Sequence, residues 1–84
     1  MEATNIEIQE NTHNGGLCGY FNVGDQQYYA DIASIFGAGN ECMIFASKDH
    51  HVTDWLELYC NRNVLITEDC LRECIDDFVT NYLK

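Results

Sequence analysis

Thiol and imidazole side chains are the residues of this chain with the most obvious capacity for chemistry. Five cysteines and three histidines occur among its 84 residues. Cys70 and Cys74 lie one helical turn apart and could contact one ion, because thiolate and imidazole are natural zinc ligands. However, no CxxC motif occurs and no second pair has finger-like spacing, which favours thiols packed as small hydrophobic side chains. We therefore expect no metal site and no cofactor.

Nucleophilic catalysis by cysteine would need a nearby base and surroundings that lower the thiol pKa. His50 and His51 fall in a predicted connection between secondary-structure elements, and the many carboxylates of the chain oppose thiolate formation. The segment 37–39 (Gly-Ala-Gly) lacks the third glycine, the lysine and the helix start of a phosphate-binding loop, so it is predicted to be a turn. We expect no catalytic residue and no enzymatic activity.

The charge balance is the most unusual property of the sequence. Fourteen Asp and Glu residues stand against four Lys and Arg residues, which gives a formal net charge of −10 at pH 7. Such an excess repels nucleic acid and anionic lipid and speeds the encounter with basic surfaces, although it would also serve solubility alone. We expect a protein partner, no direct binding of nucleic acid and no membrane association.

The odd number of cysteines and the N-terminal sequence indicate a reducing compartment. Residues 1–11 contain neither the basic nor the apolar segment of a secretory signal, and an odd cysteine count argues against a disulfide framework. No apolar run approaches the ~20 residues needed to cross a bilayer. The sequence therefore predicts a cytoplasmic protein in which residues 1–84 form a single domain.

The first half of the chain has the periodicity of β-strands. Apolar and polar residues alternate over residues 5–9, which is typical of an edge strand. Segments 17–23 and 26–32 flank a two-residue hairpin turn, and segment 42–46 is a nearly continuous apolar run that suits a central strand. The pattern predicts an antiparallel meander of three strands, with the N-terminal segment as a fourth.

The second half changes to helical periodicity. Thr53 is a good N-cap, and the spacing of Trp55 and Tyr59 favours a short helix over residues 54–60, although apolar alternation there would also fit a strand. Thr67 is predicted to cap a longer helix with one apolar stripe. We therefore expect an α+β fold, a three- to four-stranded sheet covered on one face by two C-terminal helices.

The outer face of the last predicted helix concentrates the negative charge. Arg72 can pair with Glu68, but the other carboxylates there stay uncompensated, at axial steps of roughly 5–6 Å. Nucleic acid is also a regular line of negative charge, and proteins bind it through Lys/Arg grooves. A simply solvated helix face would carry the same residues. The predicted partner-binding residues are Glu68, Asp69, Glu73, Asp76 and Asp77, supplemented by Asp54 and Glu57.

In its size, charge balance and acidic face the chain resembles the very small acidic proteins of phages and mobile elements, including anti-CRISPR inhibitors and other DNA mimics. The resemblance covers general character rather than a sequence motif. It implies a stoichiometric inhibitor, in the cytoplasm of a host cell, that occupies the basic nucleic-acid-binding surface of a host complex. The alternative is a structural, assembly or regulatory protein that forms a homodimer or hetero-complex through exposed Tyr28, Tyr29 or Trp55.

Overall fold

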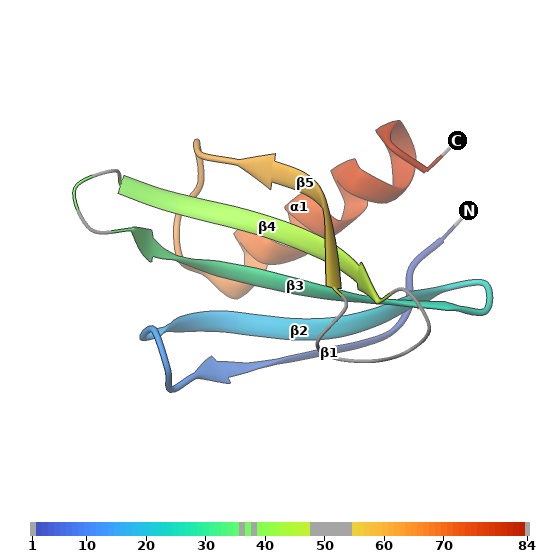
Figure 1. The fold of residues 1–84 in the computed structure, drawn as a ribbon, viewed down its shortest axis with the longest axis horizontal. Coiled ribbons are helices and arrows are strands. Elements are labelled where there is room, and N and C mark those ends of the chain that lie inside the picture. Colours follow the sequence, from blue (N-terminus) through green and yellow to red (C-terminus); the bar gives the residue numbers. More distant parts are fainter. Residues whose placement is uncertain (1, 36, 38, 48–54, 84) are drawn as a thin grey trace.

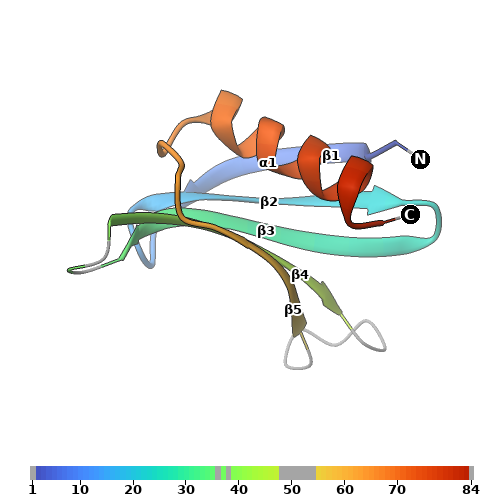
Figure 2. The same ribbon diagram turned by 90° about the horizontal axis from the view of Figure 1, so that it is seen from above.

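Five antiparallel strands and one helix make up the described part of the chain. The computed structural model describes residues 2–35, 37, 39–47 and 55–83. The strands follow one another across a single sheet, and the helix lies on one side of it (Figures 1 and 2). The elements are β1 (Thr4–Asn11), β2 (Gly16–Val23), β3 (Gln26–Ile35), β4 (Gly39–Ser47), β5 (Trp55–Asn61) and α1 (Glu68–Asn81).

The α+β class and the antiparallel meander are confirmed, but the predicted helix over residues 54–60 is wrong. Residues 55–61 form β5, which pairs with β4. A central position for the apolar segment 42–46 requires a strand on each side, and β5 satisfies the backbone groups that β4 would otherwise expose. The described residues therefore contain five strands rather than three or four, and one helix rather than two. The proposed cap Thr53 lies outside them, as does Asp54.

A bulge in β5 explains why its sequence does not show a simple strand pattern. The ladder pairs Ile44 with Tyr59 and then Phe45 with Glu57, so that Leu58 is the extra residue. Tyr59 is buried, whereas Leu58 and Cys60 are exposed. Within residues 57–61, where burial is described, the buried side chain is therefore Tyr59 and not one of the alternating apolar residues that favoured a strand.

The core lies between α1 and the facing side of the sheet, and Phe78 is at its centre. Its ring contacts those of Phe21, Tyr28 and Tyr59, with centroids 6.2, 5.3 and 6.0 Å away. These edge-to-face arrangements are the ones that aromatic pairs prefer. The largest fully buried side chains are Phe21, Phe78, Ile32, Ile44, Leu71, Ile75 and Cys42.

The burial of Tyr28 corrects the proposed apolar interface. Tyr28 is 7% exposed and stacks on Phe21 with a centroid distance of 5.3 Å. It therefore belongs to the core and is not available to a partner. Tyr29 points to the opposite face of the sheet, because side chains alternate along a strand. The side chain of Trp55 is outside the part of the chain that the structure describes.

The helix agrees with the prediction at its start and along its buried stripe. The Thr67 hydroxyl accepts a hydrogen bond from the Cys70 backbone N–H at 3.1 Å, which satisfies one of the free donors of the first turn. Glu68 and Asp69 then place negative charge at the positive end of the helix dipole. Five buried side chains fix the rotation of α1 about its axis: Leu71, Cys74, Ile75, Phe78 and Val79.

Glycine allows the edge strand β1 to lie close against β2. A Cβ atom on Gly19 would stand 2.5 Å from the carbonyl oxygen of Glu7, nearer than real Cβ contacts come. Because no side chain is present there, Ile6 and Ile8 of β1 can reach the core from the edge of the sheet. This arrangement places β1 beside α1 (Figure 2).

Truncation of the central ring should be the most damaging change in the core. We expect Phe78→Ala to lower the free energy of unfolding by about 3–5 kcal/mol, because it removes apolar contacts and leaves a cavity. Urea denaturation measures the loss. Leu65→Ala, at a side chain that is 68% exposed, is the control and should change stability by less than about 0.5 kcal/mol. Similar losses in both variants would contradict this description of the core.

Candidate functional site

Three carboxylates form a continuous row on the outer face of α1. Asp69, Glu73 and Asp76 are all exposed, and they follow one another at intervals of four and three residues, which places them on one side of the helix. No ion pair found among the described residues includes any of the three. We call these residues the acidic row. Its rigidity comes from the buried stripe on the other side of the same helix.

The two remaining acids of the predicted helix face have partners within the chain. Arg72 donates from Nε and Nη2 to one carboxylate oxygen of Glu68, at 3.2 and 3.1 Å. Asp77 is half-buried and accepts hydrogen bonds from the Tyr59 hydroxyl at 2.9 Å and from the Asn81 amide at 2.6 Å. Asp77 therefore connects α1 to β5, and its charge is directed inward rather than to a partner.

Tyr59 is held as a hydrogen-bond donor at this connection. Burial raises its pKa far above the usual value, and although Asn61 opposes the shift, the neighbouring Asp77 carboxylate adds to it. The phenol therefore stays protonated over the physiological range. Asn61 in turn donates to the Tyr59 oxygen at 3.3 Å, so the hydroxyl is both donor and acceptor.

Of the two supplementary residues, the structure describes Glu57, which does not extend the acidic row. Glu57 lies on β5 opposite Phe45, and directly opposed residues of a ladder share one face of the sheet. The ring of Phe45 lies 6.1 Å from that of Tyr29, on the side away from α1. Glu57 therefore lies on the opposite face of the sheet from the acidic row. A helix over residues 54–60 would not have placed it there. Asp54 is outside the described residues.

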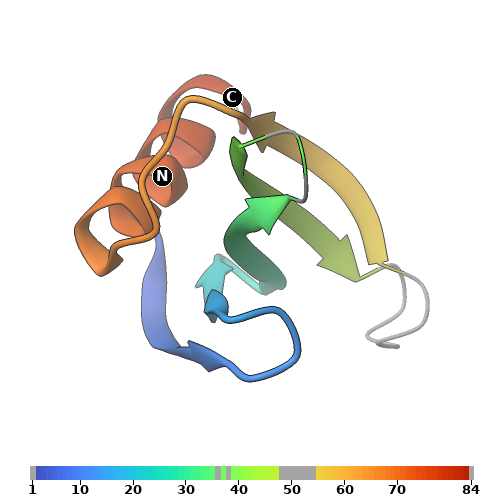
Figure 3. The ribbon, with the colours of Figure 1, turned by 90° about the vertical axis from the view of Figure 1, so that its left-hand side faces the viewer.

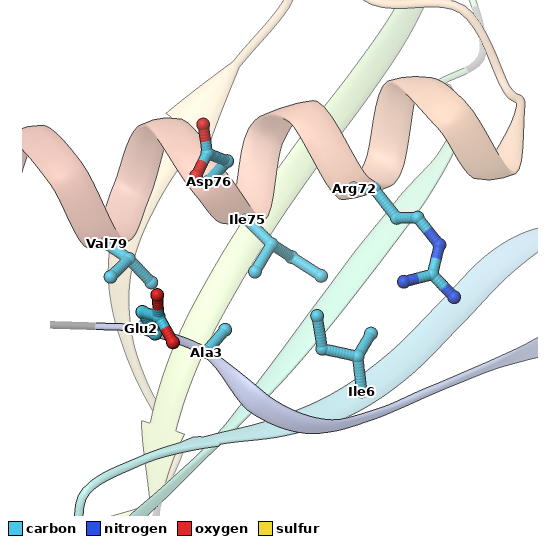
Figure 4. A pocket seen from close by; sticks show the side chains of 7 residues that line it. All are labelled: Glu2, Ala3, Ile6, Arg72, Ile75, Asp76 and Val79. Atoms are coloured by element: carbon cyan, nitrogen blue, oxygen red, sulfur yellow. The ribbon is translucent and has the colours of Figure 1, made fainter.

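A groove between α1 and β1 runs beside the acidic row (Figure 4). It encloses about 270 Å³, and in Figure 4 Ile6 and Ile75 point toward each other across its floor. Three charged side chains line the groove: Asp76, which belongs to the acidic row, Glu2, and Arg72, whose guanidinium group pairs with Glu68. An apolar floor below carboxylates suits a long cationic side chain, whose aliphatic stem packs while its charged end reaches the acids. The sequence did not reveal this groove because it joins two distant segments.

Most of the cysteine side chains pack in the interior of the protein. Cys18, Cys42 and Cys74 are buried, Cys70 is half-buried and Cys60 is exposed. The hydrogen bond with Cys74, together with burial, raises the pKa of the Cys42 thiol far above its usual value. Within the described residues, no group of three or more His, Cys, Asp or Glu side chains could hold a metal ion.

No protein-family model, no curated protein sequence and no solved structure matches the chain. Over the part of the chain that the structure describes, no helix is long and apolar enough to span a membrane. The site must therefore be interpreted from its own geometry and charge.

Removal of the Tyr59 hydroxyl should destabilise the fold. We expect Tyr59→Phe to lower the free energy of unfolding by about 1–2 kcal/mol, because the Asp77 carboxylate would lose its donor from β5. Urea denaturation of the variant gives the value. Tyr82→Phe is the matched control, since Tyr82 is 58% exposed. Equal effects of the two substitutions would show that the bond to Asp77 contributes nothing.

The cysteine thiols should react with a thiol reagent at rates that follow their exposure to solvent. In the folded protein we expect a rapid reaction of Cys60 with Ellman's reagent, whereas the three buried thiols react only after unfolding. Partial loss of solvent around the sulfur, with the Glu41 carboxylate beside it, raises the pKa of Cys60 above its usual value, so the fast phase should accelerate as the pH is raised into the alkaline range. Cys60→Ser should abolish that phase. Fast reaction of the buried thiols, or fewer than five thiols in unfolded protein without reductant, would contradict the assignment.

Proposed function

We propose that the protein is a non-catalytic binding protein that occupies a basic, nucleic-acid-binding surface of another protein and thereby inhibits it. The observation that supports this proposal is the acidic row: three exposed carboxylates that take part in no ion pair with another described residue, on a helix whose rotation is fixed by the core. An anti-CRISPR or other DNA-mimic inhibitor, encoded by a phage and acting in the host cytoplasm, would need such a surface.

Fixed charge is what distinguishes this surface from a flexible acidic tail. A rise of 1.5 Å per residue separates successive carboxylates of the row by roughly 5–6 Å along the helix axis. Because α1 is already ordered, binding does not have to order a backbone at the same time. Each Lys or Arg of the partner would then bind a carboxylate on a helix that is already ordered before the complex forms.

The net charge of the chain adds a longer-range contribution. At −10 the protein is drawn toward positively charged grooves and repelled by nucleic acid, which favours a fast encounter with the proposed partner. At about 0.15 M salt the screening length is ~8 Å, so attraction should already weaken there and fall further as salt rises. The groove beside Asp76 supplies a less salt-sensitive contribution, because it also buries an aliphatic stem.

Charge reversal on two different surfaces tests this proposal. Affinity capture from a lysate of the source cell would use the wild type, an acidic-row variant (Asp69→Lys, Glu73→Lys and Asp76→Lys) and a control (Glu7→Lys, Asp25→Lys and Glu57→Lys). Both variants change the net charge equally, and all six positions are exposed. We expect a nucleic-acid-binding protein to be retained by the wild type and the control but lost from the acidic-row variant. Equal retention by all three, or equal loss from both variants, would contradict the assigned surface.

A further inference from the structure

The face of the sheet away from α1 carries a row of three aromatic rings. Tyr20, Tyr29 and Phe45 come from three adjacent strands, with centroid distances of 5.2 Å between the first two and 6.1 Å between the last two. Their neighbours Tyr28 and Ala30 point to the core, so this row is not part of the packing against α1. Nothing in the proposed function uses these rings.

The turn between β1 and β2 lies over one end of this face (Figure 3). Asn14 in the turn donates from Nδ2 to both carboxylate oxygens of Asp31 on β3, at 3.3 Å each. The Asn14 side-chain oxygen accepts from the Gly16 backbone N–H at 2.9 Å, and the Gly15 N–H donates to the Asn11 carbonyl at 2.9 Å. The turn is therefore held in place above the sheet by its own hydrogen bonds.

Turn and sheet together line an open cavity of about 440 Å³ at the surface. Tyr20, Tyr29 and Asp31 line it from the sheet, and Glu10 and His13 from the side of the turn. Neither Lys nor Arg is found among the described residues that line it. Burial and then the Asp31 carboxylate raise the pKa of Tyr29, as expected where the local potential is negative.

We propose that this cavity binds the guanidinium group of an arginine side chain presented by a protein partner. The Asp31 carboxylate can accept further hydrogen bonds, because two oxygens offer about four acceptor sites and the single Asn14 amide group occupies only part of them. The faces of Tyr20 and Tyr29 attract a cation through their π electrons. Arginine suits this site better than lysine, because its planar guanidinium group can form a bidentate hydrogen bond with a carboxylate and also stack on an aromatic ring.

The cavity is separate from the acidic row. The cavity opens on the face of the sheet opposite α1, so a side chain bound there does not contact Asp69, Glu73 or Asp76. If both sites are used, the protein can hold basic groups on two sides at once. If the acidic row binds nothing, the cavity can still bind arginine.

A titration followed by ¹⁵N–¹H NMR tests the proposal on the full chain. The probes are three capped tripeptides, Gly-X-Gly, in which X is arginine, lysine or citrulline, the neutral isostere of arginine. We expect saturable shifts from the arginine peptide in amides of segments 13–20 and 29–31. The citrulline peptide should bind at least tenfold more weakly and the lysine peptide several-fold more weakly.

Matched variants separate this site from attraction by the overall charge. Asp31→Asn should weaken arginine binding at least tenfold, Tyr20→Leu several-fold and Tyr20→Phe little, because phenylalanine keeps the ring. A variant with Asp69→Asn, Glu73→Gln and Asp76→Asn should bind the peptide as the wild type does, whether or not the proposed function holds. Equal binding of the citrulline peptide to the wild type, shifts confined to α1, or no saturable shift would each overturn the proposal. The peptide comparison on the wild type decides the matter even if a variant fails to fold.

Discussion

The packing of Phe78 against the sheet is the contact on which the rest of the structure depends. Its ring meets aromatic side chains from three strands, β2, β3 and β5, and so fixes both the position and the rotation of α1. Once this face of the helix is buried, the opposite face must meet solvent. The acidic row is therefore displayed by the same interaction that stabilises the core.

Because one face of α1 is buried, its acidic residues have different roles that depend on their distance from that face. Asp77 lies near the margin of the buried stripe and accepts a hydrogen bond from Tyr59, whereas Glu73, one helical turn earlier, lies exposed at the surface. On the far side of the sheet, Asp31 orders the β1–β2 turn. The carboxylates of the chain are therefore not equivalent, because Asp77 and Asp31 position parts of the fold, whereas those of the acidic row meet solvent.

Local patterns predicted the parts of the fold that local interactions determine. The Thr67 cap, the apolar stripe of α1 and the hairpin turn between β2 and β3 depend on residues close in sequence, and all were foreseen. A strand at β5 was only the alternative to a short helix, because the spacing of Trp55 and Tyr59 fits a helix, whereas pairing with β4 decides the outcome. The inward role of Asp77 and the cavity around Asp31 could not be foreseen, because each depends on a contact between distant segments.

In the proposed function, a fixed row of carboxylates takes the place of nucleic acid on a basic surface. The most direct measurement is competition, in which a labelled oligonucleotide is bound to the captured partner and the protein is added at increasing concentration. The account predicts complete displacement of the oligonucleotide at saturation, without a ternary complex. A stable complex that contains partner, protein and oligonucleotide together would contradict it.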